Sequence, residues 1–184
     1  KTIDPEAVWD DFAILIRANS QAAPVMNVLE NAGIPYEFLA ASGLYRQPIV
    51  LDAVNFLKVI NDRQESNAIY RLLRLPFLKF SENDLQCLAY NRQKRTLSFY
   101  TAIKQALELK ISKEGQNTCT KLLKLIHQGM RQTRELKITE ILVNFFEESG
   151  YNNYLIEEEE KGNGQVIRQI YQLRQFLEGI KKYE

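Results

Sequence analysis

The segment with the clearest structural signal runs from Asp11 to Leu51, where strand-like and helix-like patterns alternate. Phe12 to Ile16 is an apolar run that is too short for a helix and flanked by charge, which is typical of a buried strand. Ser20 is suited to cap a following helix, and Gly33 is suited to end it. Ile34 to Ala40 then predicts a second strand. Strand, helix and strand within about thirty residues predict a parallel βαβ unit.

Two parallel strands and one helix leave sheet edges and apolar faces uncovered. We therefore expect the βαβ segment to belong to a larger sheet, and the chain to be a piece of a longer protein. The small residues Ala40 to Gly43 predict a hinge, although an ordinary loop between a strand and a helix would have the same composition. The hinge would divide the chain into residues 1–41 and 42–184.

Beyond the hinge, each periodic segment predicts a helix, because apolar residues recur at steps of three and four. The expected helices cover or include residues 49–60, 65–75, 85–89, 97–109, 117–135, 138–150 and 166–180. Ser81 and the residues after it suggest a helix cap, and the acidic run Glu157 to Glu160 suggests a solvated turn. The last helix has a seam with alternating spacing of four and three, which either pairs chains or packs on its own domain. The expected fold class is mostly α, with a short βαβ piece in front.

Charge is distributed unevenly along a chain whose net charge is only +1. Residues 63–137 carry fifteen Lys and Arg against six Asp and Glu. A basic centre between acidic flanks favours a polyanionic partner. Helices that are simply well solvated would give the same count.

Composition excludes several classes of protein. No apolar run approaches the ~18 residues of a membrane span, so no membrane partner is expected. The two cysteines, Cys87 and Cys119, lie far apart, and with the single His127 they do not form an ordinary zinc site. This usage suits a reducing, cytoplasmic setting. There is no GxxxxGK[ST] phosphate loop, so the chain alone is expected to bind no nucleoside triphosphate and to hydrolyse nothing.

Four short blocks carry a family resemblance: AILIRAN followed by SQ, then GIPYEF, SGLYRQP and LDAVNFLKVI. In this order they resemble the second motor lobe of the UvrD/PcrA/Rep family of DNA helicases, running into the accessory subdomain inserted in that lobe. The resemblance is specific over about residues 11–60. Further on it weakens to a pattern of helices, with LRQFLEGIKKYE near the end again similar to the family.

The resemblance implies part of an ATP-dependent DNA helicase. Residues 1–41 would be a βαβ piece of a RecA-like α/β lobe, and residues 42–184 a multi-helix accessory subdomain that contacts DNA and regulates unwinding. The intact protein would use ATP and Mg²⁺ and act on single-stranded DNA and duplex junctions, with the remaining helicase domains as partners. The alternative is a non-enzymatic helical module that binds a protein through its final helix.

Within the matching block, Arg17 corresponds to the family arginine that reaches the terminal phosphate of ATP. Its role would be that of an arginine finger, with Gln21 a second nucleotide-binding residue. An exposed arginine at a strand end is the simpler alternative. Two positions depart from the family pattern: Ile16 stands where an aromatic residue often stacks on adenine, and Ala23 stands where an arginine is common.

A third departure concerns DNA. Family members have a Gly-Ile-Gly turn that meets the duplex backbone, whereas residues 75–81 here contain no glycine. Contact with phosphates would instead come from Lys79, Arg92, Lys94 and Arg95, without regard to sequence. The neighbouring aromatics Tyr90, Phe99 and Tyr100 either stack on bases or belong to the core.

Overall fold

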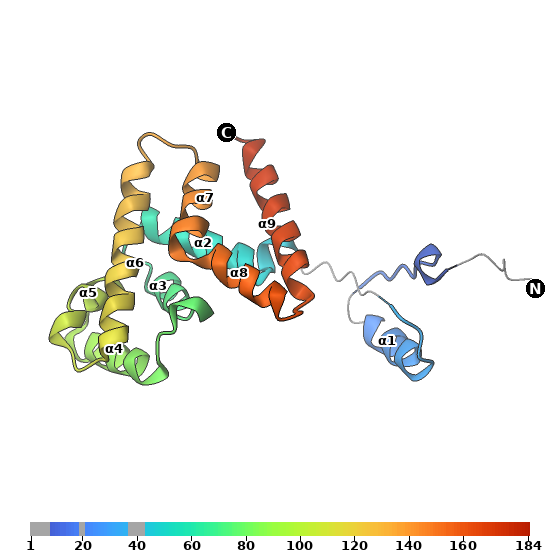
Figure 1. Ribbon diagram of the computed structural model, residues 1–184, viewed down its shortest axis with the longest axis horizontal. Coiled ribbons are helices and arrows are strands. Elements are labelled where there is room, and N and C mark those ends of the chain that lie inside the picture. Colours follow the sequence, from blue (N-terminus) through green and yellow to red (C-terminus); the bar gives the residue numbers. More distant parts are fainter. Residues whose placement is uncertain (1–7, 19–20, 37–42) are drawn as a thin grey trace, which may run out of the picture. The chain divides into compact units, whose positions relative to one another are not determined.

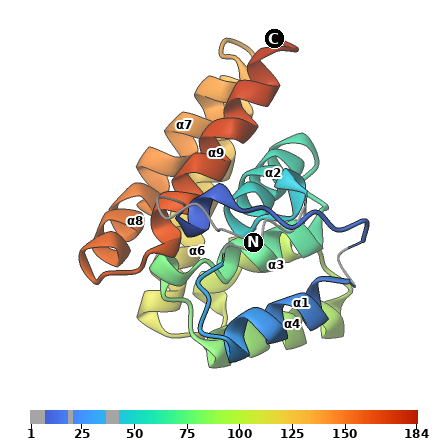
Figure 2. The same ribbon diagram turned by 90° about the vertical axis from the view of Figure 1, so that its right-hand side faces the viewer.

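The computed structural model describes residues 8–18, 21–36 and 43–184, and its regular elements there are helices (Figures 1 and 2). The chain divides into two compact units, Lys1–Gly43 and Leu44–Glu184. The predominance of helix agrees with the sequence pattern.

In the first unit, a short 3₁₀ turn η1 (Trp9–Asp11) precedes an extended segment, and helix α1 spans Ala22–Asn31. Gly33 follows α1 with φ +65°, in the left-handed conformation that favours glycine at a helix end. Both the helix and its glycine stop lie where the sequence predicts them.

The two predicted strands are not formed in the part of the chain that the structure describes. Phe12 to Ile16 is extended but has no ladder partner, and the residues from Phe12 to Leu15 are open to solvent, with Leu15 95% exposed. Residues 34–36 are irregular, and 37–40, the rest of the second predicted strand, lie outside the described residues. A strand exists through hydrogen bonds to a neighbour, and an isolated pair is marginal in water. The predicted hinge at Ala40 to Gly43 also falls almost entirely outside the described residues.

The second unit is a stack of helices joined by short loops and turns. Its elements are η3 (Leu44–Arg46), α2 (Pro48–Asn61), α3 (Ser66–Leu73), η4 (Pro76–Leu78), α4 (Glu82–Arg95), α5 (Phe99–Lys104), η5 (Ala106–Glu108), α6 (Lys113–Gln132), α7 (Ile138–Ser149), α8 (Tyr151–Glu160) and α9 (Gln165–Lys181). Helix α2 packs against α3, α6 and α9, and α7 runs beside α6 and α9 (Figures 1 and 2). The core of the unit therefore forms around α2.

The crossing of α2 and α6 depends on a glycine. Phe56 of α2 is 2% exposed and stacks on Phe145, with ring centroids 4.1 Å apart. A Cβ added at Gly129 would lie 2.8 Å from Phe56 Cζ and 2.9 Å from Ile60 Cγ2. Contacts that short force the neighbours to move, and overpacking of a core costs about 1–3 kcal/mol. Glycine at position 129 lets the two helices approach closely.

Serine hydroxyls cap three helices of the second unit. Ser81 Oγ accepts the N–H of Asp84 at 3.1 Å, Ser98 Oγ accepts that of Thr101, and Ser112 Oγ accepts that of Gly115. Each bond satisfies a backbone donor that the first turn of a helix leaves free. The sequence pattern indicated only the first of these caps.

Asp84 joins the starts of α4 and α6. Its carboxylate accepts the Ser112 backbone N–H at 2.8 Å and the Ser112 hydroxyl at 2.6 Å. Although desolvation raises the pKa of Asp84, the hydrogen bonds from Ser112 and Ser81 outweigh it, and the pKa lies below its ordinary value. The carboxylate also lies at the N-terminal ends of α4 and α6, where the positive ends of the two helix dipoles stabilise a negative charge.

We expect Asp84→Asn to lower the free energy of unfolding by about 2 kcal/mol at neutral pH, because two hydrogen bonds to a charged group are weakened. A depressed pKa contributes stability that is present above the unfolded-state pKa and is lost as the pH falls through the folded-state pKa. The gap between wild type and variant should therefore close in acid. Urea unfolding at several pH values measures it; a gap that is constant with pH would contradict this role.

Two parts of the sequence pattern were misread. Glu157 to Glu160 is the last turn of helix α8, not a loop, and the segment 97–109 is split into α5 and η5. In the final helix, Val166 is buried and Leu173 packs against the core of its own unit, as do Leu177 and Ile180. The seam is thus largely occupied within the chain, which leaves little of it for a second protein.

Candidate nucleotide and nucleic-acid sites

Arg17 and Gln21 lie together at the bend that follows the extended segment. The backbone N–H groups of Arg17 and Ala18 donate to Gln21 Oε1, at 3.2 and 3.3 Å. The glutamine oxygen therefore fixes the backbone that carries Arg17. This contact gives Gln21 a positioning role that the sequence did not reveal.

The Arg17 side chain is exposed, and the structure describes no ion pair for it among residues 8–18, 21–36 and 43–184. A guanidinium keeps its charge at all relevant pH values and presents a planar fork of donors that suits phosphate oxygens. Gln21 has only its amide N–H groups left for a ligand, since its oxygen is engaged.

The four basic residues predicted to meet DNA do not form one cluster. Lys79 precedes α4, whereas Arg92, Lys94 and Arg95 lie in its last turn, about 20 Å away along a helix of this length. Lys79 is exposed and has φ +51°, so the chain makes a left-handed turn here without glycine, at a cost of about 1–2 kcal/mol.

Of these four, Arg92 is held in internal contacts. Its Nε donates to the carbonyl of Leu97 at 3.1 Å, and its Cζ lies 4.9 Å from the ring centroid of Phe99. Lys94 and Arg95 are exposed. The structure thus leaves these two and Lys79 as the accessible cations of the predicted set.

The aromatic residues near them separate into two kinds. Phe99 and Tyr100 are 4% and 7% exposed and belong to the core, whereas Tyr90 is 65% exposed. Base stacking needs an open ring face, so of these three only Tyr90 offers one.

A group of basic side chains that sequence reasoning missed surrounds Tyr100. Arg63 Cζ lies 5.5 Å and Lys104 Nζ 5.8 Å from the Tyr100 ring centroid, and the Tyr100 hydroxyl shares a 2.8 Å hydrogen bond with His127 Nε2. We call Arg63, Tyr100, Lys104 and His127 the Tyr100 cluster. The only sequence signal was the overall basic excess, because the four residues are spread over 65 positions of the chain.

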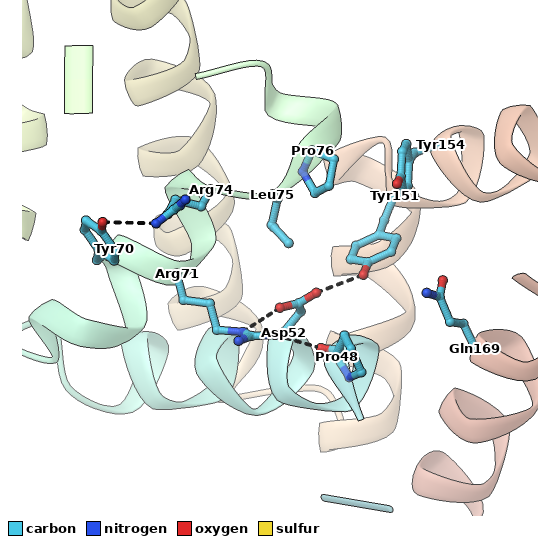
Figure 3. Close-up of a pocket in the computed structure, with 10 residues that line it drawn as sticks. All are labelled: Pro48, Asp52, Tyr70, Arg71, Arg74, Leu75, Pro76, Tyr151, Tyr154 and Gln169. Atoms are coloured by element: carbon cyan, nitrogen blue, oxygen red, sulfur yellow. Dashed lines mark hydrogen bonds and ion pairs between the residues drawn. The ribbon is translucent and has the colours of Figure 1, made fainter. Parts of the chain in front are cut away.

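A pocket of about 490 Å³ lies in the second unit between α2, α3, α8 and α9 (Figure 3). At its base, the Asp52 carboxylate accepts Arg71 Nε–H at 2.7 Å and the Tyr151 hydroxyl at 2.8 Å. Arg71 also donates to the Pro48 carbonyl at 3.1 Å. Figure 3 shows Gln169 and Tyr154 on the side of the pocket opposite Tyr70 and Arg74.

The carboxylate at this pocket is a buried anchor rather than a reactive group. Burial raises the pKa of Asp52 above its ordinary value, although Tyr151 and Arg71 both oppose the shift. Burial and the nearby Asp52 raise the pKa of Tyr151, which keeps its hydroxyl a donor. Both oxygens of Asp52 are engaged, so the group ties α2, α3 and α8 together. The apolar periodicity of α2 gave no sign of this polar contact.

Two features are absent from the residues that the structure describes. No grouping of three or more His, Cys, Asp or Glu side chains there is arranged to hold a metal ion. Among the helices the structure describes, none combines the length and apolar character that crossing a membrane requires.

Comparison with known proteins shows that the chain is similar to DNA helicases. The family model described as UvrD-like helicase C-terminal domain matches residues 3–184. The chain is 20% identical over 176 residues to the ATP-dependent DNA helicase PcrA of Staphylococcus epidermidis, and equally so to that of Staphylococcus aureus. The match covers 96% of this chain but 24% of each relative. With nearly its whole length matched by the family model, the chain belongs to the family of UvrD-like helicase C-terminal domains.

Proposed function

We propose that the chain is part of an ATP-dependent DNA helicase that translocates on single-stranded DNA. Family membership and the names of the PcrA relatives support this proposal. The observation that carries it is the exposed guanidinium of Arg17, on a backbone bend held by Gln21, inside the sequence block that resembles the helicase motor.

In the proposed site, Arg17 contacts the terminal phosphate of ATP from the opposite side of a cleft between two lobes. Phosphoryl transfer gains from such a cation because negative charge must be stabilised on the transferred group. Bound ATP with Mg²⁺ supplies the phosphoryl group and the divalent charge. The phosphate loop and the metal ligands would come from other domains of the helicase, and Gln21 would orient Arg17 and offer its amide to the nucleotide.

The first unit would complete a RecA-like lobe. We infer that Phe12 to Ile16 and Ile34 to Ala40 pair as parallel strands once a larger sheet is present, with α1 as the crossover helix of the βαβ unit. The exposure of Phe12, Ile14 and Leu15 supports this, because apolar side chains at 60% or more exposure gain from burial. The lobe would end near residue 41, and residues 42–184 would form the accessory subdomain.

The second unit would contact DNA at single-stranded and duplex junctions and regulate unwinding in the cytoplasm. Lys79, Lys94 and Arg95 are exposed cations that support phosphate contact, and Arg92 would reach DNA only by giving up its contacts with Leu97 and Phe99. Such contacts read the backbone and not the bases.

A salt titration tests the proposed contact with DNA. We expect the 184-residue chain to bind a fluorescein-labelled tailed duplex only weakly, with an affinity that falls steeply between ~50 and ~200 mM salt as condensed counterions are displaced by protein cations. Fluorescence anisotropy gives the binding constant at each salt concentration. Absence of binding at the lowest salt, or binding that does not change with salt, would contradict the proposal.

A further inference from the structure

The Tyr100 cluster brings basic side chains from three separate parts of the second unit to one ring. Arg63 follows α2, Lys104 ends α5 and His127 lies on α6, and α5 and α6 are neighbours (Figure 1). Both full charges lie within 6 Å of the Tyr100 ring centroid, the range in which a cation is attracted to an aromatic face. The Tyr100 ring thus contacts both cations and orients them.

None of the ion pairs of the described residues involves this cluster. Among the residues that the structure describes, neither Arg63 nor Lys104 forms an ion pair, and His127 has none either. The nearest acid along the chain, Asp62, accepts the backbone N–H of Gln64 at 2.8 Å. Like charges held together repel one another, so the cluster is more favourable when an anion lies against it.

The positive surface continues along α6. Lys124 lies three residues before His127 and Arg131 four residues after it, which puts all three on one side of the helix. All three side chains are exposed. At 1.5 Å per residue, the row from Lys124 to Arg131 spans about 10 Å. Two full positive charges, at Lys124 and Arg131, flank the imidazole in this row, and such a row matches a ligand whose negative charges repeat along a line.

We propose that the Tyr100 cluster and the adjacent row on α6 bind the phosphodiester backbone of DNA, in addition to the Lys79, Lys94 and Arg95 positions. The inference rests on the proposed contact of this subdomain with DNA and specifies where it occurs. Tyr100 is buried and orients the cations, so it does not stack on a base. Contact through phosphates makes the surface indifferent to sequence.

The test compares two double variants of the 184-residue chain on the same tailed duplex. Arg63→Gln with Lys104→Gln removes both charges but keeps long polar side chains. Loss of two phosphate contacts should weaken binding on the order of 50-fold at about 0.1 M salt, and should make the slope of log K against log salt shallower by about 2. The loss should be the same for DNA of any sequence.

Two controls make the result specific. Arg74→Gln removes a cation that makes the same kind of contact, with its Cζ 5.7 Å from the Tyr70 centroid, and should change affinity less than about twofold, because Arg74 belongs to neither proposed set of DNA contacts. Lys94→Gln with Arg95→Gln removes two charges from the last turn of α4. Circular dichroism and the thermal midpoint of each variant show whether the fold is kept.

The outcomes separate this inference from the proposed function. If the Lys94 and Arg95 variant loses affinity while the Arg63 and Lys104 variant binds like wild type, DNA contact stands but the surface assigned here is wrong. If Arg74→Gln weakens binding as much per charge removed as the Arg63 and Lys104 variant does, the effect is one of total charge and the inference also fails. A wild-type chain that binds no DNA removes the proposed contact itself.

Discussion

Replacing Arg17 with alanine in the complete protein is expected to lower ATP turnover by about 10³-fold or more, while affinity for single-stranded DNA stays nearly unchanged. The size follows from the contribution of an arginine finger to phosphoryl transfer, about 10³–10⁵ in rate. Arg17→Lys should recover only part of the rate, because an ammonium is a point charge without the planar fork of donors. Steady-state ATP hydrolysis with saturating single-stranded DNA measures turnover.

A matched control and a positioning variant complete this test. Arg168, an exposed arginine of α9, should tolerate alanine without loss of turnover. Gln21→Ala should lower turnover less than Arg17→Ala does, since it frees the bend at Arg17 and Ala18 but keeps the guanidinium. Full turnover in Arg17→Ala would show that the exposed arginine has no part in hydrolysis.

The second large effect concerns the buried carboxylate beneath the pocket of Figure 3. We expect Arg71→Ala to lower the free energy of unfolding by about 3 kcal/mol at neutral pH, because Asp52 is left as a buried charge without its cation. The value is at the low end of the range for buried pairs, since the Arg71 side chain is 37% exposed. Urea unfolding followed by circular dichroism measures it, and a loss within about 0.5 kcal/mol, as for ordinary surface substitutions, would contradict the anchoring role.

The pH dependence of this loss has a definite sign. The pKa of Asp52 is raised in the folded state, so its contribution to stability is fully present below the unfolded-state pKa and is lost as the pH rises through the folded-state pKa. Removing Arg71 takes away a group that opposes the upward shift. The Arg71→Ala variant should therefore recover stability relative to wild type as the solution is acidified, whereas Asp84→Asn approaches wild type in acid because the wild type itself loses stability.

Local periodicity predicted most of the helices, whereas the two predicted strands are not seen among the described residues, for a physical reason. A helix such as α2 or α7 satisfies its backbone within its own segment, so an apolar stripe is enough to indicate it. A strand needs hydrogen bonds from a neighbour, and the extended run at Phe12 to Ile16 has none among the described residues. Helix α8 escaped prediction because its apolar stripe is sparse and its end is a run of glutamates.

The candidate sites also differ in how far the sequence could predict them. Arg17 and Gln21 are close in sequence, so one motif could indicate both. The Tyr100 cluster and the Asp52, Arg71 and Tyr151 contact join residues from distant helices, and composition alone does not reveal which charges meet. Arg92 shows the converse, since a basic residue that looks available in the sequence is held by Leu97 and Phe99 in the fold.

The most direct test of the account is the response of ATP hydrolysis to DNA in the complete protein that contains these residues. With Mg²⁺ present, the account predicts slow hydrolysis without DNA and a large rise in turnover when single-stranded DNA is added, a rise that the Arg17→Ala variant lacks. A complete wild-type protein that hydrolyses no ATP, or whose turnover is the same with and without single-stranded DNA, would contradict it.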